Sequence, residues 1–397
     1  MSTLKRRVII GIAFAVIILL GVAAFFYRPT RLALERAESF QFRRMQVTQQ
    51  DEEGTFRFFF ITNRTLPDEA GPIEERFSNE RKDSLTFGLF DTEIEPALSI
   101  GMLVNPTDWF QNEAIQLKRV DILSKDGFLE QLGDQVARSP FRSVLINING
   151  FRERFPSALS KTAFLGHVMD IDSPVVTFDW PGNQGSGPRG YLRAQRTASE
   201  SGAALAQSLR LINEHVKPDR IWIVANSMGA QVVVHAFTDL YKTSDYADIE
   251  PEIENVVLTA PDVDRNRFNE QFKQEISALS QYLTVYVSSN DRALLMSRLI
   301  NRGRRLGEST FSTDDDNEIE TASDIFALVE PDEKLVSIVD VTPINRTRNF
   351  HNFSLETPEF FDDLYLRLVN GGIVGSRTEY QIETPDGRGY SILTSGR

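Results

Sequence analysis

Apolar and polar positions follow two different patterns along this chain. From Phe141 to Asn370, short apolar runs are separated by longer stretches with helical spacing. The runs that predict buried strands are Ser143–Ile148, Val175–Phe178, Ile221–Val224, Asn255–Thr259, Leu283–Ser288 and Ser337–Val341. The stretches that predict helices are Phe155–Met169, Leu192–Glu214 and Pro358–Asn370. Strand–helix alternation is typical of a parallel sheet, so this part predicts a doubly wound α/β fold with a mainly parallel sheet.

The segment before this alternation predicts antiparallel strands that lead into the sheet. The strand candidates are the aromatic run Thr55–Thr62 and the stretches Ser84–Phe90, Leu98–Asn105 and Lys118–Ile122. Pro67–Lys82 is rich in charged and turn residues and is expected to be a surface loop. One folded domain is therefore expected over residues 55–370, and the turn-rich residues 371–397 are either a loose tail or a final hairpin.

The N-terminus has the pattern of a membrane anchor. Residues 1–7 carry Lys5, Arg6 and Arg7, and residues 8–27 form an uncharged, largely apolar run long enough to span a bilayer. Basic residues ahead of such a run place the N-terminus in the cytoplasm. We therefore expect a single-pass protein of the inner (cytoplasmic) membrane, with a polar stalk over 28–54 and the folded domain on the periplasmic or extracellular side. A cleavable signal peptide is the alternative, although the apolar run is long for one.

The stretch Ile221–Ala230 predicts a nucleophile. Its apolar strand is followed by Ala225-Asn226-Ser227-Met228-Gly229 and then by a second apolar stretch that can continue as a helix. Strand, small-x-Ser-x-Gly and helix is the nucleophile elbow of α/β hydrolases, in which the turn requires small residues two before and two after the serine. Ala225 in place of the usual first glycine meets that requirement. Ser227 is therefore the expected nucleophile.

The acid and the base are expected beyond the carboxyl ends of later strands, in the order Ser, Asp/Glu, His. Asp291 follows the second strand after the nucleophile strand, and His351 follows the run Ser337–Val341. These positions predict His351 as general base and Asp291 as the residue that orients it. Asp291 can equally be a helix N-cap, and Asp262, one strand after the nucleophile, is the rival acid.

A hydrolase of this kind also needs two amides that stabilise the oxyanion. The Met228 amide is one candidate, and the loop Gly150-Phe151, after the strand Ser143–Ile148, supplies the other. A simple tight turn is the alternative for that loop. Asn149, Trp180, Asn226 and Asp262 are expected to line the site, and the glycine-rich loop after Trp180 either shapes the cleft or is a solvated linker.

Composition narrows the function further. The formal net charge of −13 argues against nucleic acid, and against an anionic membrane face, as the main partner. Cysteine is absent and there are four histidines, without a His-Glu-x-x-His motif or a cluster of ligands. No metal site and no cofactor are therefore expected, and the sequence defines no protein partner.

Several segments taken together resemble a bacterial group of α/β hydrolases catalogued as domain of unknown function number 900, within the esterase/lipase superfamily. They span about Phe56–Val369 and are FFFITNRT (58–65), LTFG (85–88), NGF (149–151), FDWPG (178–182), GYLRAQRTASES (190–201), ANSMG (225–229), VVLTAPDVD (256–264), VYVSSNDRALLMSR (285–298) and VDVTP…HNF (339–353). The resemblance implies an α/β-hydrolase fold, a serine esterase or lipase activity, and the same triad. Two departures, Asn149 and Asn226 where the group usually has histidine, lie in the expected site.

The sequence thus predicts a membrane-anchored serine hydrolase that cleaves carboxylic esters through an acyl-enzyme on Ser227. Its substrate would be a small-molecule or lipid ester. The alternatives are a lipid or thioester acyl hydrolase that works at the bilayer, and a non-catalytic binding or scaffold protein that keeps the fold. The complete Ser–Asp–His set favours an enzyme over the scaffold.

Overall fold

A computed structural model describes residues 45–51, 54–68, 70–94, 115–242, 253–308, 336–346, 351–371, 379–383 and 389–395. The expected membrane span at 8–27 and the strand candidate Leu98–Asn105 lie outside these residues. Among the residues that are described, none of the helices combines the length and the apolar character needed to cross a membrane.

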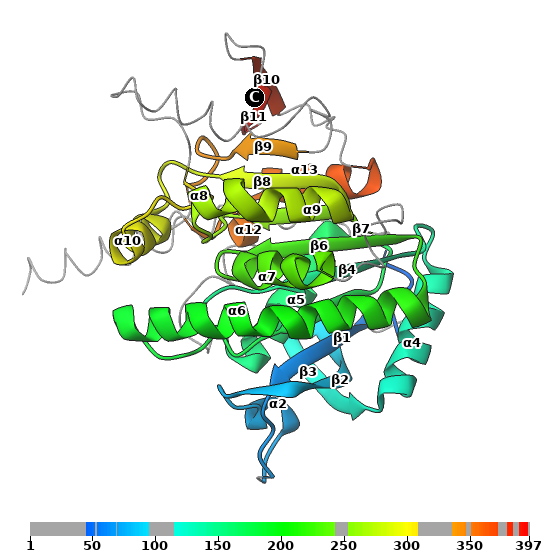
Figure 1. Cartoon of the computed structure of the whole chain (residues 1–397). Helices are drawn as coiled ribbons and strands as arrows, with labels where there is room; N and C mark the ends of the chain where they lie inside the picture. The colour runs from blue at the N-terminus through cyan, green and yellow to red at the C-terminus, as the bar shows by residue number, and fades with distance from the viewer. Residues whose placement is uncertain are drawn as a thin grey trace, which may run out of the picture.

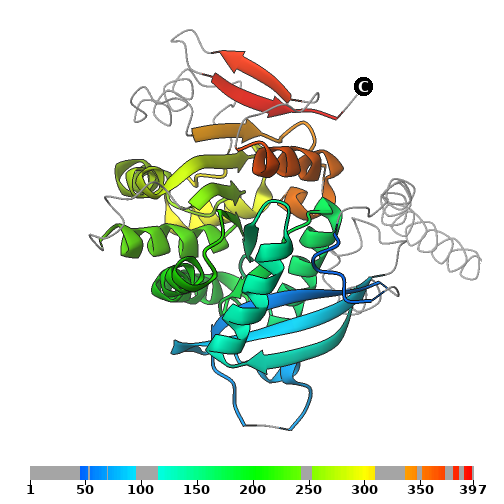
Figure 2. The ribbon, with the colours of Figure 1, turned by 90° about the vertical axis from the view of Figure 1, so that its right-hand side faces the viewer.

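The described chain is built on one mixed sheet of eleven strands (Figures 1 and 2). Its order is β10-β11-β9-β8-β7-β6-β4-β5-β1-β2-β3, and neighbours from β11 to β1 pair in parallel. Antiparallel pairs close both ends, with β2 and β3 at one end and the hairpin β10–β11 at the other. The strands are β1 (Thr55–Arg64), β2 (Arg81–Ile94), β3 (Ile115–Leu123), β4 (Ser143–Ile148), β5 (Val175–Asp179), β6 (Arg220–Asn226), β7 (Ile253–Thr259), β8 (Ser280–Val287), β9 (Val336–Asp340), β10 (Glu379–Glu383) and β11 (Gly389–Leu393).

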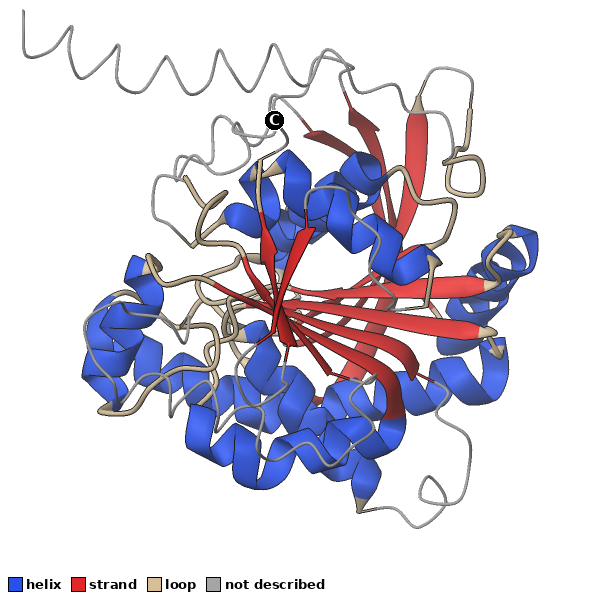
Figure 3. Cartoon of the chain, turned by 90° about the horizontal axis from the view of Figure 1, so that it is seen from above, coloured by secondary structure: helices blue, strands red, loops and turns tan. Residues whose placement is uncertain are grey.

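Helices cover both faces of the twisted sheet (Figure 3). They are α2 (Ile73–Arg76), α4 (Lys125–Arg138), α5 (Phe155–Met169), α6 (Gly187–Leu211), α7 (Gly229–Tyr241), α8 (Arg265–Arg267), α9 (Lys273–Leu279), α10 (Arg292–Asn301), α12 (Phe353–Glu356) and α13 (Pro358–Val369), with the π-helical turns η2 (Ile212–Val216) and η4 (Phe268–Phe272). Each face has its own apolar core: α4, α6, α7 and α9 pack on one, and α5, α12 and α13 on the other.

The two cores follow from strand periodicity, because successive side chains of a strand point to opposite faces. In β1, Phe59 and Ile61 enter the core with α6, whereas Phe58 and Phe60 enter the core with α5. These side chains are at most 1% exposed. Apolar residues on both faces explain why the parallel strands read as continuous apolar runs rather than alternating ones.

The fold confirms the predicted α/β sheet and differs from the sequence predictions at several elements. Helix α4 was not predicted, although Ser124 caps it and apolar residues recur at helical spacing. The expected loop Pro67–Lys82 contains α2 and the first residues of β2. The stalk was expected to extend to residue 54, but Met45 and Val47 are each 4% exposed and pack on the domain. Of the two alternatives for the C-terminal residues, the described part forms the hairpin, and its strand β11 pairs in parallel with β9.

The order of the central strands defines where a site can form. The chain passes from β4 to β5 on one side and then crosses through α6 to β6 on the other side of β4. This reversal leaves a crevice beyond the carboxyl ends of β4 and β6, which is the usual ligand position in open α/β sheets. Gly150 follows β4 and Ser227 follows β6.

Candidate functional site

Ser227 occupies a strained turn between β6 and α7. Its φ is +52°, a left-handed conformation that non-glycine residues rarely adopt. The turn packs tightly against the loop after β4: a Cβ on Gly229 would lie 2.6 Å from the Asn149 carbonyl oxygen, and one on Gly150 would lie 3.1 Å from the Ser227 Cβ. Glycine at 229 is therefore required by close approach, as expected of a nucleophile elbow.

Three side chains from distant parts of the chain meet at this turn. The His351 Nε2 atom lies 2.8 Å from the Ser227 Oγ, and the His351 Nδ1 atom lies 2.6 Å from the Asp291 Oδ2. All three are largely shielded, since Ser227 is 7% and Asp291 4% exposed and the His351 side chain is 14% exposed. The three residues that the sequence singled out as nucleophile, acid and base are thus brought into one hydrogen-bonded chain.

Asp291 has two roles at once. Its Oδ1 accepts a hydrogen bond of 2.9 Å from the Leu294 amide and caps α10, while its Oδ2 faces His351. The sequence presented the cap and the triad acid as alternatives, and the geometry accommodates both. The cap fixes the carboxylate, so the orientation of the imidazole depends on the start of α10.

Two carboxylates influence the protonation of the histidine. Burial lowers the pKa of His351, but the charge and hydrogen bond of Asp291, together with the charge of Asp262, raise it more, so the pKa lies above its ordinary value of 6.5. Asp291 also favours the tautomer with the proton on Nδ1, which leaves Nε2 free to accept the Ser227 proton. This is the arrangement that a general base needs.

The candidate oxyanion residues lie around Ser227. Gly150 and Phe151 line the same cavity as Ser227, and Met228 is fully buried at the start of α7. The Ser227 amide donates to the Thr259 carbonyl at 2.9 Å, so it is not available to a substrate. Within the described chain no hydrogen bond occupies the amide of Gly150, Phe151 or Met228. All three amides therefore remain candidates.

Asp262, the rival acid, has different partners. Its Oδ1 lies 2.6 Å from the Arg305 Nε and accepts a 2.6 Å hydrogen bond from Ser297, and its Oδ2 accepts one of 2.6 Å from Tyr191. The Asp262 and Arg305 side chains are 5% and 3% exposed. Asp262 lines the cavity as expected, but its carboxylate is committed to Arg305 rather than to His351.

Some of the other residues that were expected to line the site instead hold neighbouring segments in place through hydrogen bonds. Asn149 and Asn226 line the cavity, and the Asn226 Nδ2 donates to Thr259 at 3.1 Å and to Ser354 at 3.0 Å. Trp180 differs from the expectation, because it is not among the lining residues. Instead its indole Nε1 donates to the Asn149 carbonyl at 2.8 Å, from beneath the loop that carries Gly150.

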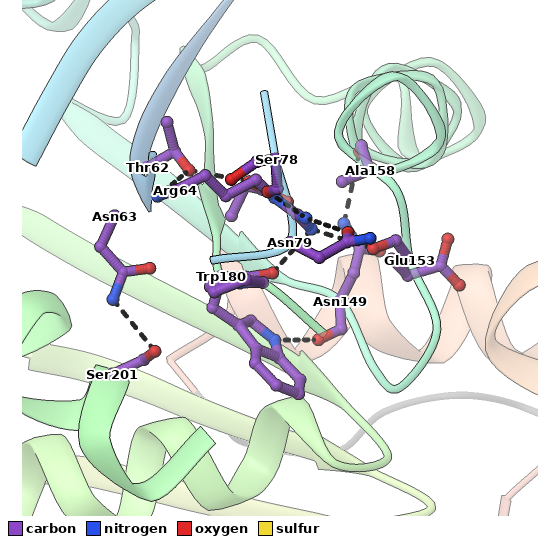
Figure 4. Close-up of polar contacts among 12 residues, drawn as sticks. Thr62, Asn63, Arg64, Ser78, Asn79, Asn149, Glu153, Ala158, Trp180 and Ser201 are labelled. Atoms are coloured by element: carbon purple, nitrogen blue, oxygen red, sulfur yellow. Dashed lines mark hydrogen bonds and ion pairs between the residues drawn. The ribbon is translucent and has the colours of Figure 1, made fainter. Parts of the chain in front are cut away.

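A buried arginine that the sequence did not single out holds this loop in place (Figure 4). The fully buried Arg64 pairs with Asp179 at 2.6 Å and donates to the Trp180 and Glu153 carbonyls at 2.8 and 2.9 Å. A planar guanidinium with five donors suits such a junction. Arg64 thereby ties β1, the end of β5 and the loop after β4 together. In the sequence, the pattern that could have drawn attention to Arg64 is its place in Asn63-Arg64-Thr65, at the end of the aromatic run of β1.

A cavity of about 350 Å³ opens at Ser227 and His351. Its walls combine apolar side chains with a few polar ones, among them the ion pair of Lys161 with Glu153, whose Nζ and Oε1 atoms are 2.5 Å apart. The sequence did not predict this pair or the contribution of α10. The apolar wall is formed by Phe151, Leu165, Val224, Leu294, Ile300 and Phe360. Among the described residues no cluster of three or more His, Cys, Asp or Glu side chains could hold a metal ion.

A family profile matches this chain, whereas the comparisons with curated sequences and solved structures are not informative. No curated protein sequence matches the chain. Among solved structures, it is similar to one of a protein from Agrobacterium vitis S4, with 10% identity, coverage of 74% of this chain and 96% of that chain, and a TM-score of 0.32, which is too low to support a conclusion.

The sequence profile of the family described as "Alpha/beta hydrolase of unknown function (DUF900)" matches residues 124–361. The matched region begins at the cap of α4, covers every strand from β4 to β9, and includes Ser227, Asp291 and His351. Hydrolysis is the class of reaction that this match supports. The chain therefore belongs to the DUF900 family of α/β hydrolases.

Proposed function

We propose that this hydrolase cleaves carboxylic esters by a serine mechanism. The observation that carries the proposal is the hydrogen-bonded chain from Ser227 through His351 to Asp291, with both contacts at 2.6–2.8 Å. An isolated serine hydroxyl is a poor nucleophile at neutral pH and requires a base within hydrogen-bond reach. His351 is at that distance.

The reaction would proceed in two steps. The Ser227 Oγ attacks the ester carbonyl carbon while the His351 Nε2 takes its proton, and the amides of Met228 and Phe151 stabilise the oxyanion. His351 then protonates the leaving alkoxide, and an acyl-Ser227 ester remains. Water attacks this ester with His351 again as base, so that the acid is released and Ser227 is restored.

Ester turnover by the parent and by Ser227→Ala tests the proposal. A panel of p-nitrophenyl esters with graded acyl length should be hydrolysed by the parent, with loss of turnover in Ser227→Ala. Circular dichroism of the variant should show the parent fold. Full turnover by a folded Ser227→Ala would exclude the serine mechanism, and no turnover by the parent on any ester would favour the non-catalytic scaffold.

Membrane anchorage by residues 8–27 is a second proposal, supported by the basic residues ahead of an uncharged, largely apolar run. The protein should remain in the membrane fraction after an alkaline carbonate wash, and a phosphatase fused to its C-terminus should be active outside the cytoplasm. An inactive phosphatase with an active cytoplasmic reporter would reverse the orientation. Soluble protein starting near Phe25 would show a cleaved signal peptide.

A further inference from the structure

Among the described residues, the exposed edge of the cavity is formed by the helices α6 and α10. Of the residues that line the cavity, the exposed ones are Gly187 and Pro188 at the start of α6 and Ala293 and Met296 on α10. All other lining residues are buried or half-buried. In the described part of the chain, the cavity therefore opens between α6 and α10. In Figure 1, α10 projects beyond the body of the sheet.

Large apolar side chains are exposed around this entrance. Leu192 on α6 is 48% exposed, and Leu295, Met296 and Leu299 on α10 are 49%, 57% and 65% exposed. The two helices are joined beneath them, because the Tyr191 hydroxyl lies 2.7 Å from the Ser297 hydroxyl. Single exposed apolar residues need no explanation, but Leu295, Met296 and Leu299 share one short helix, and Met296 itself lines the cavity. Several large apolar side chains exposed this close to a site indicate an interaction surface.

The same two segments are basic in an acidic protein. Residues 182–199 and 292–307 contain no aspartate or glutamate, although the chain has a net charge of −13. The exposed arginines of these segments are Arg189, Arg193, Arg196, Arg292, Arg298 and Arg302. Glu308, just after the second segment, lies 3.8 Å from Arg298. Exposed apolar side chains that share their segments with exposed arginines are typical of proteins that lie on an anionic lipid surface.

We propose that this entrance surface, defined by Leu192, Leu295, Met296, Leu299 and the exposed arginines around them, docks on an anionic phospholipid bilayer. The leucines and Met296 would enter the headgroup boundary while the arginines contact lipid phosphates. A lipid ester could then pass from the bilayer to Ser227 without crossing water, a step that rests on the proposed function. The net charge of −13 taken alone argues against an anionic membrane as partner. It is an average over the whole chain, however, whereas the arginines are concentrated in these two segments.

A second copy of the chain fits this surface less well. A symmetric dimer through the entrance surface would bring arginines of both copies together, and like charges in a desolvated interface oppose association. Phospholipid phosphates supply the opposite charge, and acyl chains accept the leucines. The lipid surface is therefore the occupant that matches both features.

The absence of cysteine allows a direct test with the full-length chain. Leu299→Cys carries a polarity-sensitive fluorophore at the entrance surface, and Ile122→Cys, at a residue 40% exposed on edge strand β3, is the matched control. With phosphatidylcholine vesicles that contain phosphatidylglycerol, the emission at 299 should shift to shorter wavelength and that at 122 should not. High salt should reverse the shift. Arg298→Gln with Arg302→Gln should lower the ratio of shifted to unshifted label about fivefold per arginine.

Four outcomes would overturn the proposal: an unshifted label at 299, equal shifts at 299 and 122, equal shifts with and without phosphatidylglycerol, or a shift that grows with protein concentration in the absence of lipid. The last would assign the surface to a second copy. Labelling of Ser227 by a fluorophosphonate probe is measured in parallel. A shifted label without a Ser227 adduct would retain the docking surface and reject the serine mechanism, and an adduct without a shift would do the reverse.

Discussion

Two buried aspartates follow neighbouring strands at the same edge of the sheet, and their partners give them different chemistry. Asp262 follows β7 and is paired with Arg305 at 2.6 Å, whereas Asp291 follows β8 and contacts His351 at 2.6 Å. Both are nearly inaccessible, at 3% and 4% exposure. Position, burial and contact distance therefore do not distinguish them.

The partner distinguishes them, because an arginine remains charged at all accessible pH values while a histidine titrates near neutrality. The Asp262–Arg305 pair is a fixed unit that joins the loop after β7 to α6 and α10 through Tyr191 and Ser297. The Asp291 carboxylate instead acts on a group that can gain and lose a proton. The contacts make Asp262 a support of the entrance helices, and in the proposed mechanism Asp291 orients the base.

The largest effect is expected where His351 and Ser227 are removed. Residues that act as one unit are not additive, so Ser227→Ala, His351→Ala and the double variant should each lose about 10⁵–10⁶-fold in kcat. Steady-state kinetics on a short-chain ester measures this. If the losses multiply in the double variant, Ser227 and His351 act independently. His351 would then not be the base for Ser227, and its contact with Asp291 would no longer distinguish Asp291 from Asp262.

Asp291→Asn should come next, with a loss of about 10⁴-fold in kcat, because an amide holds the imidazole in the wrong tautomer. The asparagine Oδ1 can still cap α10, so thermal unfolding should change little. Parent-like turnover by Asp291→Asn, with loss in Asp262→Asn, would transfer the role of the acid to Asp262.

Asp262→Asn should mainly destabilise the fold. Removal of one partner from a buried ion pair typically costs about 3–5 kcal/mol, since Arg305 would be left buried without its counter-charge. Denaturant unfolding should show this cost, and turnover below the unfolding transition should fall by much less than in Asp291→Asn. Arg305→Gln provides the second corner of a double-mutant cycle, in which strong coupling with Asp262→Asn is expected. Independent effects would contradict the pairing.

The pH dependence should show the smallest and most specific difference. Asp291 raises the pKa of His351 above 6.5, and a general base must be unprotonated, so kcat/KM should fall as pH decreases through that raised value. Asp291→Asn removes the main cause of the increase and should move the acidic limb to lower pH. Arg305→Gln keeps both carboxylates, whose charges raise the pKa of His351, and should not move the limb to lower pH. An identical limb in Asp291→Asn would contradict the assignment.

Local patterns predicted much of this molecule. The bounds of Phe155–Met169 agree with α5, and the apolar run before Ser227 is β6. The elbow could be predicted because its steric requirement lies within five consecutive residues. Asp291 and His351 could be predicted because the carboxyl ends of parallel strands share one edge, so the order along the chain indicates proximity.

The remaining features depend on contacts between distant segments. The hairpin at β11 pairs with β9 across a long stretch of chain, and the composition of its segment gives no indication of that partner. Arg305 reaches Asp262 from 43 residues away. The entrance surface likewise combines α6 and α10, and neither segment alone shows that its arginines and leucines surround one cavity.

The most direct test of the central claim is the site of fluorophosphonate labelling. Peptide mapping of the full-length parent should locate the adduct on Ser227, the labelling should be abolished in His351→Ala, and it should be retained in Arg305→Gln at a temperature where that variant is folded. An adduct on another serine, or unchanged labelling of Ser227 without His351, would contradict a nucleophile that His351 activates.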